Sequence, residues 1–260
     1  MKVTSLRPFI FPNAPAGLER LDYVSAVDGH TDWAGVLPGA DAATWVVCIH
    51  GHGSHGDQLY VRPDVREHWL PRWRARGCGI LTPNLRDNAW MSPPAAADMH
   101  ALVQWLRSER GAKRFLFLSG SMGGTSNLIY ATLHPDDVSG LAAMGAVSDL
   151  ASYHSWCRTR KEPAVVAQIA DAIERAYGGI PANRPAPYAR HSTLAHADRL
   201  SMPIFLAHGA DDKLMPVSQS RDLAAKLADR PTFRYVEIAG GNHDSPLWQG
   251  EGFAWVMDAL

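Results

Sequence analysis

The sequence predicts an α/β fold built on a doubly wound, mostly parallel β-sheet with a helical insertion. Short apolar, β-branched runs recur along the chain, and helical periodicity fills several of the gaps between them. The chain has 260 residues, 46% of them hydrophobic, so it is long enough to enclose a full core as one domain. We therefore expect a single domain over residues 1–260, with residues 149–200 as a lid or cap insertion.

Six segments read as buried strands because each is a short apolar run bounded by turn residues. In chain order they are Thr44–Ile49, Gly79–Leu81, Phe115–Leu118, Leu141–Val147, Pro203–Ala207 and Phe233–Ile238.

The clearest helix lies between the second and third of these strands. Ser92 is its expected N-cap, Pro93 occupies its first turn, and Gly111 stops it. The apolar residues between them recur at helical spacing: Met99, Leu102, Val103 and Leu106.

Residues 149–200 interrupt the alternation of strands and helices. The segment holds an amphipathic stretch and then a Gly/Pro-rich run from Gly178 to Pro187. Fifty structureless residues are improbable inside a compact domain, so we expect an insertion over one end of the sheet. The apolar positions of the amphipathic stretch are Val166, Ile169, Ile173 and Ala176.

Composition and charge limit the classes of partner that the chain is expected to bind. The chain carries 25 Lys+Arg against 26 Asp+Glu, a net charge of −1, which offers no footprint for nucleic acid. It contains no run of about 18 apolar residues that would cross a membrane, and its start does not read as a secretory signal. We expect a cytoplasmic protein with a small-molecule substrate, and we expect Cys48, Cys78 and Cys157 to be buried reduced thiols. A homo-oligomer is left open, because apolar surface on the insertion fits a dimer as well as a pocket.

The strongest chemical signal follows the third strand. The chain continues Ser119-Gly120-Ser121-Met122-Gly123-Gly124 into a helix-like stretch, which is typical of a nucleophile elbow with Ser121 at the apex. Ser119 stands where the G-x-S-x-G pattern has its first glycine. A Gly/Ser-rich turn without chemistry is the plainer alternative.

A base and an orienting acid follow in the order that such a serine needs. Asp212 comes after the fifth strand and His243 after the sixth, and polar groups at strand ends are where doubly wound sheets place their sites. Asp211 is the rival acid. Asp149 is a third candidate, although a strand-end cap is its simpler role.

With these motifs the chain resembles the α/β-hydrolase fold superfamily, and its C-terminal half is similar to the catalytic domain of the prolyl oligopeptidase-like group. The resemblance runs from about Trp45 to Trp248. It implies the α/β-hydrolase fold, and the family pattern H-G-x-x-D-x-x-V-P aligns its acid with Asp212, leaving Met215 where valine is usual. A sequence of this length without repeats has no room for a β-propeller, which favours an esterase over a peptidase.

The resemblance also implies an oxyanion hole. His50-Gly51-His52-Gly53 stands where the family has H-G-x-G, and the expected donors are the backbone amides of Met122 and His52, with Gly53 as the alternative. The side chains of His50 and His208 are expected to form structural hydrogen bonds.

The same histidines support a different chemistry. His50, His52 and His55 have the spacing H-x-H-x-x-H, with Asp57 nearby, and zinc hydrolases of the metallo-β-lactamase type use H-x-H-x-D-H. Ser54 occupies the Asp position of that pattern, so this reading is the weaker one.

Five further residues are candidates for substrate binding because they lie near strand ends in the sequence. Packing is the alternative for each aromatic one. They are Gly53, Trp90, Tyr153, Trp156 and Trp248. Arg86 resembles a loop arginine that is usually structural in the family.

These observations predict a serine hydrolase that cleaves a short acyl, aryl or sugar ester through an acyl-enzyme on Ser121, with no metal and no cofactor. The alternatives are a peptidase or amidase with the same triad, a zinc-dependent hydrolase, and a non-catalytic binding protein with the same fold.

Overall fold

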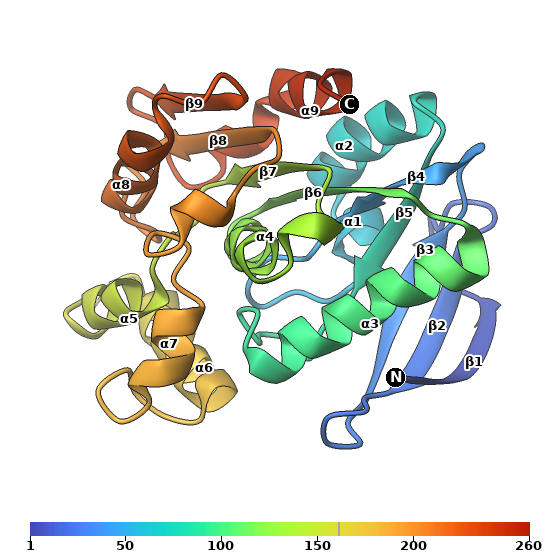
Figure 1. Ribbon diagram of the computed structural model, residues 1–260, viewed down its shortest axis with the longest axis horizontal. Helices are drawn as coiled ribbons and strands as arrows, with labels where there is room; N and C mark the ends of the chain where they lie inside the picture. Colours follow the sequence, from blue (N-terminus) through green and yellow to red (C-terminus); the bar gives the residue numbers. More distant parts are fainter. Residues whose placement is uncertain (161) are drawn as a thin grey trace.

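A computed structural model describes residues 1–160 and 162–260. Within them a nine-stranded sheet runs in the order β1-β2-β3-β5-β4-β6-β7-β8-β9 (Figure 1). The strands are β1 (Lys2–Pro8), β2 (Glu19–Val24), β3 (Thr31–Leu37), β4 (Asp41–Val47), β5 (Cys78–Pro83), β6 (Arg114–Gly120), β7 (Gly140–Met144), β8 (Ile204–Gly209) and β9 (Phe233–Ile238). The helices are α1 (Gln58–Val61), α2 (Pro63–Ala75), α3 (Pro93–Arg110), α4 (Met122–Leu133), α5 (Leu150–Arg158), α6 (Ala164–Tyr177), α7 (Pro185–Arg190), α8 (Ser218–Leu227) and α9 (Gly250–Asp258).

In the order of the sheet, the strands β5-β4-β6-β7-β8-β9 are parallel to one another. Strands β1, β2 and β3 pair antiparallel, and β3 also pairs antiparallel with β5. This confirms the predicted doubly wound, mostly parallel architecture, and all six predicted strands are present. The predicted strand over Leu141–Val147 ends three residues early, at Met144, because Gly145 turns the chain with φ +55°.

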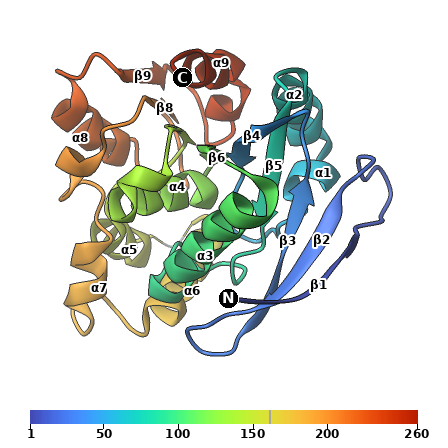
Figure 2. The ribbon, with the colours of Figure 1, turned by 45° about the vertical axis from the view of Figure 1, so that its right-hand side comes forward.

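The three N-terminal strands were not predicted. Figure 2 shows them along one edge of the molecule, and β1 is exposed along most of its length. Strands β1 and β2 carry charged residues among their apolar ones, so they lack the continuous apolar run by which buried strands are identified.

Two hydrophobic layers cover the two faces of the sheet. Along β6, Phe115 and Phe117 join the layer under α3, α4 and α8, whereas Leu116 and Leu118 join the layer under α2 and α9. Consecutive side chains of a strand point to opposite faces, so a strand covered on both faces is apolar throughout. This explains why β6 contains the uninterrupted apolar run Phe115–Leu118.

Helix α3 has the predicted limits. Pro93 is its first residue, and Gly111 ends it in the left-handed conformation with φ +68°. Such a cap favours glycine because it has no Cβ. The Ser92 side chain makes no capping hydrogen bond, although Ser92 stands at the N-cap.

Helices α5, α6 and α7 lie within the segment predicted as an insertion. They follow β7 directly and lie together beside the sheet in Figure 1. Residues Val166, Ile169 and Ile173 form the buried face of α6, as its periodicity predicts. Because α5 begins where β7 ends, this helical group stands at the edge where the parallel strands end.

No helix in the described ranges is both long enough and apolar enough to cross a membrane. The thiols of Cys48, Cys78 and Cys157 are free and buried, as predicted. Burial raises the pKa of the Cys48 thiol to about 12.

Candidate active site

Ser121 lies in the turn between β6 and α4. Its backbone has φ +58° and ψ −130°, which is an unusual conformation for a residue with a side chain. The Ser121 amide donates to the carbonyl of Met144 on β7 at 2.7 Å, which ties the turn to the neighbouring strand. This strained strand-to-helix turn is the geometry of a nucleophile elbow.

The residues around Ser121 are small because the segment just after β4 lies against them. A Cβ on Gly123 would come within 2.0 Å of the Ile49 carbonyl oxygen. Ser119, at the position where the motif usually has glycine, accepts a hydrogen bond from the Ile49 amide at 2.9 Å. The departure from the motif therefore supplies an extra link between β6 and the residues that follow β4.

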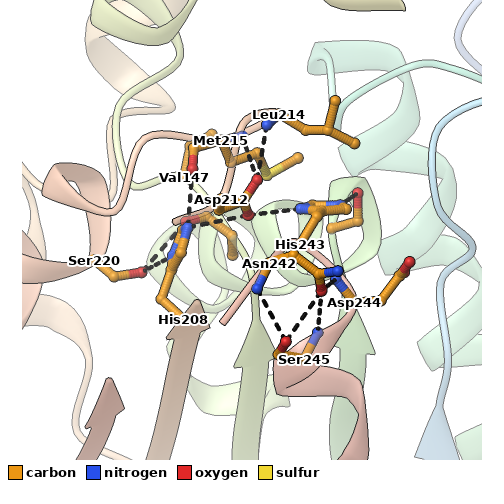
Figure 3. Close-up of polar contacts among 12 residues, drawn as sticks. Val147, His208, Asp212, Leu214, Met215, Ser220, Asn242, His243, Asp244 and Ser245 are labelled. Carbon is orange, nitrogen blue, oxygen red and sulfur yellow. Dashed lines mark hydrogen bonds and ion pairs between the residues drawn. The ribbon is translucent and has the colours of Figure 1, made fainter. Parts of the chain in front are cut away.

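Ser121, His243 and Asp212 form a hydrogen-bonded chain. The Ser121 Oγ–H donates to His243 Nε2 at 2.9 Å, and His243 Nδ1–H donates to Asp212 Oδ2 at 2.7 Å. Figure 3 shows His243 facing Asp212. Three residues from separate loops, 122 positions apart at the extremes, thus meet at the same edge of the sheet.

Asp212 is buried and held on both carboxylate oxygens. Its Oδ1 accepts from the amides of Leu214 at 2.7 Å and Met215 at 3.0 Å, as Figure 3 shows. Burial opposes its ionisation, but the hydrogen bonds from His208 and His243 outweigh that effect and lower the pKa of Asp212 below its usual value. The carboxylate is therefore charged beside His243.

The two rival acids lie elsewhere. Asp211 is exposed, and its amide donates to the Gly241 carbonyl at 2.8 Å. Asp149 caps α5 by accepting from the Ser152 amide at 2.7 Å. Only Asp212 among the three candidates contacts His243.

His208 forms structural hydrogen bonds. Its ring is fully buried, and its Nε2 lies 3.0 Å from the Met215 carbonyl and 3.3 Å from Asp212 Oδ2. Both are acceptors, so Nε2 carries the proton and Nδ1 accepts from Ser220 Oγ at 2.7 Å. His208 thereby fixes the loop that carries the acid.

The segment predicted as the oxyanion loop lies beside Ser121, since a Cβ on Gly51 would stand 3.9 Å from the Ser121 Cβ. The Gly51 amide donates to Gln58 Oε1 at 2.8 Å, and the Gly53 amide donates to Asn88 Oδ1 at 2.7 Å. The Gly53 amide therefore already donates a hydrogen bond within the protein. The amide of His52 donates to no other described residue.

The histidines of the zinc alternative do not converge. Both ring nitrogens of His50 lie 2.8 Å from backbone carbonyls, those of Gly51 and Asn84. The Nδ1 of His52 faces Trp90, and the exposed His55 pairs with Asp87 at 3.1 Å. The spacing H-x-H-x-x-H thus occurs in a loop whose three histidines have different hydrogen-bond partners, and within the described residues the three do not form a group of ligand atoms close enough to hold one metal ion.

A cavity of about 150 Å³ contains Ser121 and His243. Its polar lining includes His52, His55, Gln58, Arg62 and Asp244. Its apolar walls come from several elements: Leu59, Val65, Trp69, Val165, Ile169, Leu214, Met215 and Leu247. Most of these were not predicted, because nothing local distinguishes a leucine in a cavity wall from one in the core. Among these wall residues, the helical periodicity of the sequence picks out Ile169, on the amphipathic stretch of residues 149–200.

The residues predicted to bind substrate do not line this cavity. Trp90 and Tyr153 are buried and packed against each other, with ring centres 5.7 Å apart. Trp156 borders a separate cavity beside Lys213. Trp248 is 43% exposed and packs on His68, and Gly53 lies in the exposed loop. Packing, the alternative considered for the aromatic residues, is what the structure shows for Trp90 and Tyr153.

Arg86 is structural, as its resemblance implied. Its guanidinium pairs with Asp28 and with the buried Asp98, both at 2.7 Å. It thereby anchors the loop after β5 to the segment between β2 and β3.

The chain is similar in sequence and in fold to known proteins. The model of the BD-FAE family matches residues 38–227. Esterase LipC of Mycobacterium tuberculosis is 25% identical over an alignment 262 positions long, gaps included, and the alignment covers 94% of this chain and 60% of LipC. The chain thus spans less than two thirds of the length of that relative.

Solved structures share the fold. A putative dipeptidyl aminopeptidase IV of Bacteroides ovatus superposes with a TM-score of 0.73 at 16% identity, over 94% of this chain and 36% of the other. The fluorophosphonate-binding serine hydrolase FphF of Staphylococcus aureus superposes with a TM-score of 0.70 at 14% identity, over 95% and 100%. The α/β-hydrolase fold expected from the resemblance is confirmed.

Proposed function

Because the chain belongs to the BD-FAE family, we propose that it is a serine hydrolase that cleaves short carboxylic esters through an acyl-enzyme on Ser121. The observation that carries this proposal is the hydrogen-bonded chain from Ser121 through His243 to Asp212, with distances of 2.9 and 2.7 Å. A serine, a base and a buried orienting carboxylate in this order can activate the hydroxyl as a nucleophile.

The reaction has two halves. Ser121 Oγ attacks the ester carbonyl carbon while His243 Nε2 takes its proton, and Asp212 stabilises the resulting imidazolium. The bond to the leaving oxygen breaks as His243 returns the proton to the alcohol. Water then attacks the acyl-enzyme, His243 again accepts and returns a proton, and the free acid and Ser121 are restored.

The oxyanion of each tetrahedral intermediate would be held by the amides of Met122 and His52. Met122 is the first residue of α4, where an amide has no partner within the helix. His52 lies in the loop held by Gln58 and Asn88, so its amide is positioned before substrate arrives.

The size of the cavity favours short acyl groups. A volume of 150 Å³ is about that of an engineered cavity that accepts benzene, a molecule of about six carbon atoms. An acetyl or butyryl group fits within such a space, whereas an octanoyl group must extend out of it. Esterase LipC, a relative of this chain, is itself named as an esterase, which supports the choice of esters.

The test is a p-nitrophenyl ester series together with a fluorophosphonate probe. We expect covalent labelling at Ser121, located by peptide mapping, and a kcat/KM at least about tenfold higher for acetate and butyrate than for octanoate, because burial of each fitted methylene is favourable only inside the cavity. p-Nitroanilides of the same acids report on the amidase alternative.

Ser121→Ala is the control. It should lower kcat by several orders of magnitude and leave the melting temperature close to that of the wild type. Near wild-type esterase activity in Ser121→Ala, or labelling at another residue, would contradict the mechanism. Faster cleavage of anilides than of esters would instead assign the site to amides.

A further inference from the structure

The imidazole of His52 has a defined tautomer. Trp90 Nε1–H donates to His52 Nδ1 at 3.4 Å, and an indole nitrogen can only donate. His52 Nδ1 is therefore an acceptor, and in the neutral ring the proton is on Nε2. Burial, with a smaller contribution from His50 and Arg175, lowers the pKa of His52 to about 4, so the ring is neutral at pH 7.

The structure also holds His52 rigidly. The following amide, of Gly53, is bound by Asn88 Oδ1, and the preceding one, of Gly51, is bound by Gln58 Oε1. Trp90 itself is buried and has φ +48°, in a segment whose Arg86 amide donates to Asp32 at 2.6 Å. A donor held in this way loses little conformational entropy when it binds a ligand.

His52 lines the same cavity as Ser121 and His243. Among the described residues its Nε2 has no hydrogen-bond partner, in contrast with the nitrogens of His50 and His208. The ring thus offers an N–H donor that is not used by a described residue, in the cavity that contains Ser121.

We infer that His52 Nε2–H donates to a second oxygen of the substrate, in addition to the scissile carbonyl, so that the enzyme prefers esters with an ether, hydroxyl or carbonyl oxygen near the reacting bond over plain alkyl esters. This inference rests on the proposed function, because it concerns the same cavity. The role belongs to the side chain of His52, whereas the oxyanion hole uses its backbone amide.

The test uses two pairs of substrates that differ only by an oxygen in place of a methylene. On the acyl side the pair is p-nitrophenyl methoxyacetate and p-nitrophenyl butyrate, and on the alcohol side it is 2-methoxyethyl butyrate and butyl butyrate. The preference is the ratio of kcat/KM values within a pair. Dividing the wild-type preference by that of a variant cancels the intrinsic reactivity of the esters.

We expect His52→Phe, which keeps a ring but has no donor, to lower the preference about three- to tenfold in at least one pair, as expected for one neutral hydrogen bond. His52→Gln is the matched variant, because its side-chain amide restores an N–H donor and should recover part of the preference. A preference within twofold of the wild type in both pairs for His52→Phe would overturn the inference.

A spectroscopic measurement covers the case in which these variants fold poorly. In 15N NMR of histidine-labelled wild-type protein at pH 7, His52 should show a protonated Nε2 and an unprotonated Nδ1, and Trp90→Phe should change that signature. A proton on Nδ1 in the wild type would overturn the inference. Fluorophosphonate labelling of the same preparation separates the two proposals, because unlabelled wild-type protein contradicts the proposed function itself.

Discussion

At the scale of single residues, the two adjacent aspartates after β8 have different surroundings and therefore different expected roles. Asp212 is buried and accepts hydrogen bonds from His243, Leu214 and Met215. Asp211 is exposed and contributes only its backbone amide, to Gly241. The two differ in the direction in which the turn points each side chain.

This contrast gives a matched pair of variants. Asp212→Asn should lower kcat for p-nitrophenyl acetate by about 10³- to 10⁴-fold, because a neutral amide neither holds the His243 tautomer nor stabilises the imidazolium. Asp211→Asn should stay within twofold of the wild type. Equal losses in the two variants would show that Asp212 is not the orienting acid.

At the scale of elements, the turn from β6 to α4 works because β4, β6 and β7 are in close contact there. The Ile49 amide binds Ser119, the Ile49 carbonyl faces Gly123, and the Ser121 amide binds Met144. These contacts offset the strain of the φ +58° conformation at Ser121. They also connect Ser121 to the loop that follows Ile49.

Substitution of Gly123 tests that contact. Its Cβ would stand 2.0 Å from the Ile49 oxygen, so Gly123→Ala should destabilise the protein by about 1–3 kcal/mol and lower Tm by roughly 3 to 9 °C. Gly124→Ala is the control, because its nearest neighbours would be 3.2 Å away and a smaller shift suffices. Thermal unfolding of both variants checks the order, and equal Tm values would contradict it.

At the scale of the whole molecule, residues 149–200 are hydrogen-bonded to the loop after β5. His191 Nδ1–H donates to the Met91 carbonyl at 3.0 Å, and Tyr177 Oη–H donates to the Trp90 carbonyl at 3.1 Å. Asn88 and Trp90 of the same loop contact Gly53 and His52. Residues 84–92 thereby connect the segment 149–200 to the loop that carries His52 and Gly53.

This connection should make stability sensitive to acid. Burial, the largest effect, lowers the pKa of His191 to about 4, whereas an unfolded histidine titrates near 6.5. Between these values the unfolded chain binds a proton that the folded protein does not, so the free energy of unfolding falls as the pH falls from about 6.5 to about 4.

Urea unfolding at pH 7.5 and pH 5.0 measures this effect. The wild type should lose up to about 2 kcal/mol more over this interval than His191→Gln, whose amide can still donate to Met91. His30→Gln, which changes an exposed histidine, is the control and should keep the wild-type difference. An unaltered difference in His191→Gln would show that another group causes the acid sensitivity.

Local patterns were sufficient wherever a short stretch of sequence has one stable outcome. The apolar runs of the central strands, the Pro93 and Gly111 limits of α3, and the small residues around Ser121 each follow from backbone sterics or from burial on both faces. The choice of Ser121, Asp212 and His243 likewise followed from the sequence, because each comes after a predicted strand.

Tertiary structure decided what depends on side-chain direction and on neighbours distant in sequence. It separated Asp212 from Asp211, directed His50, His52 and His55 to different partners, and buried Trp90 and Tyr153 in the core. It also added β1 to β3, of which the edge strand β1 is exposed along most of its length and lacks the signal of a buried strand. The physical reason is that periodicity and turn chemistry are properties of a few consecutive residues, whereas burial and hydrogen-bond partners are set by the packing of the whole chain.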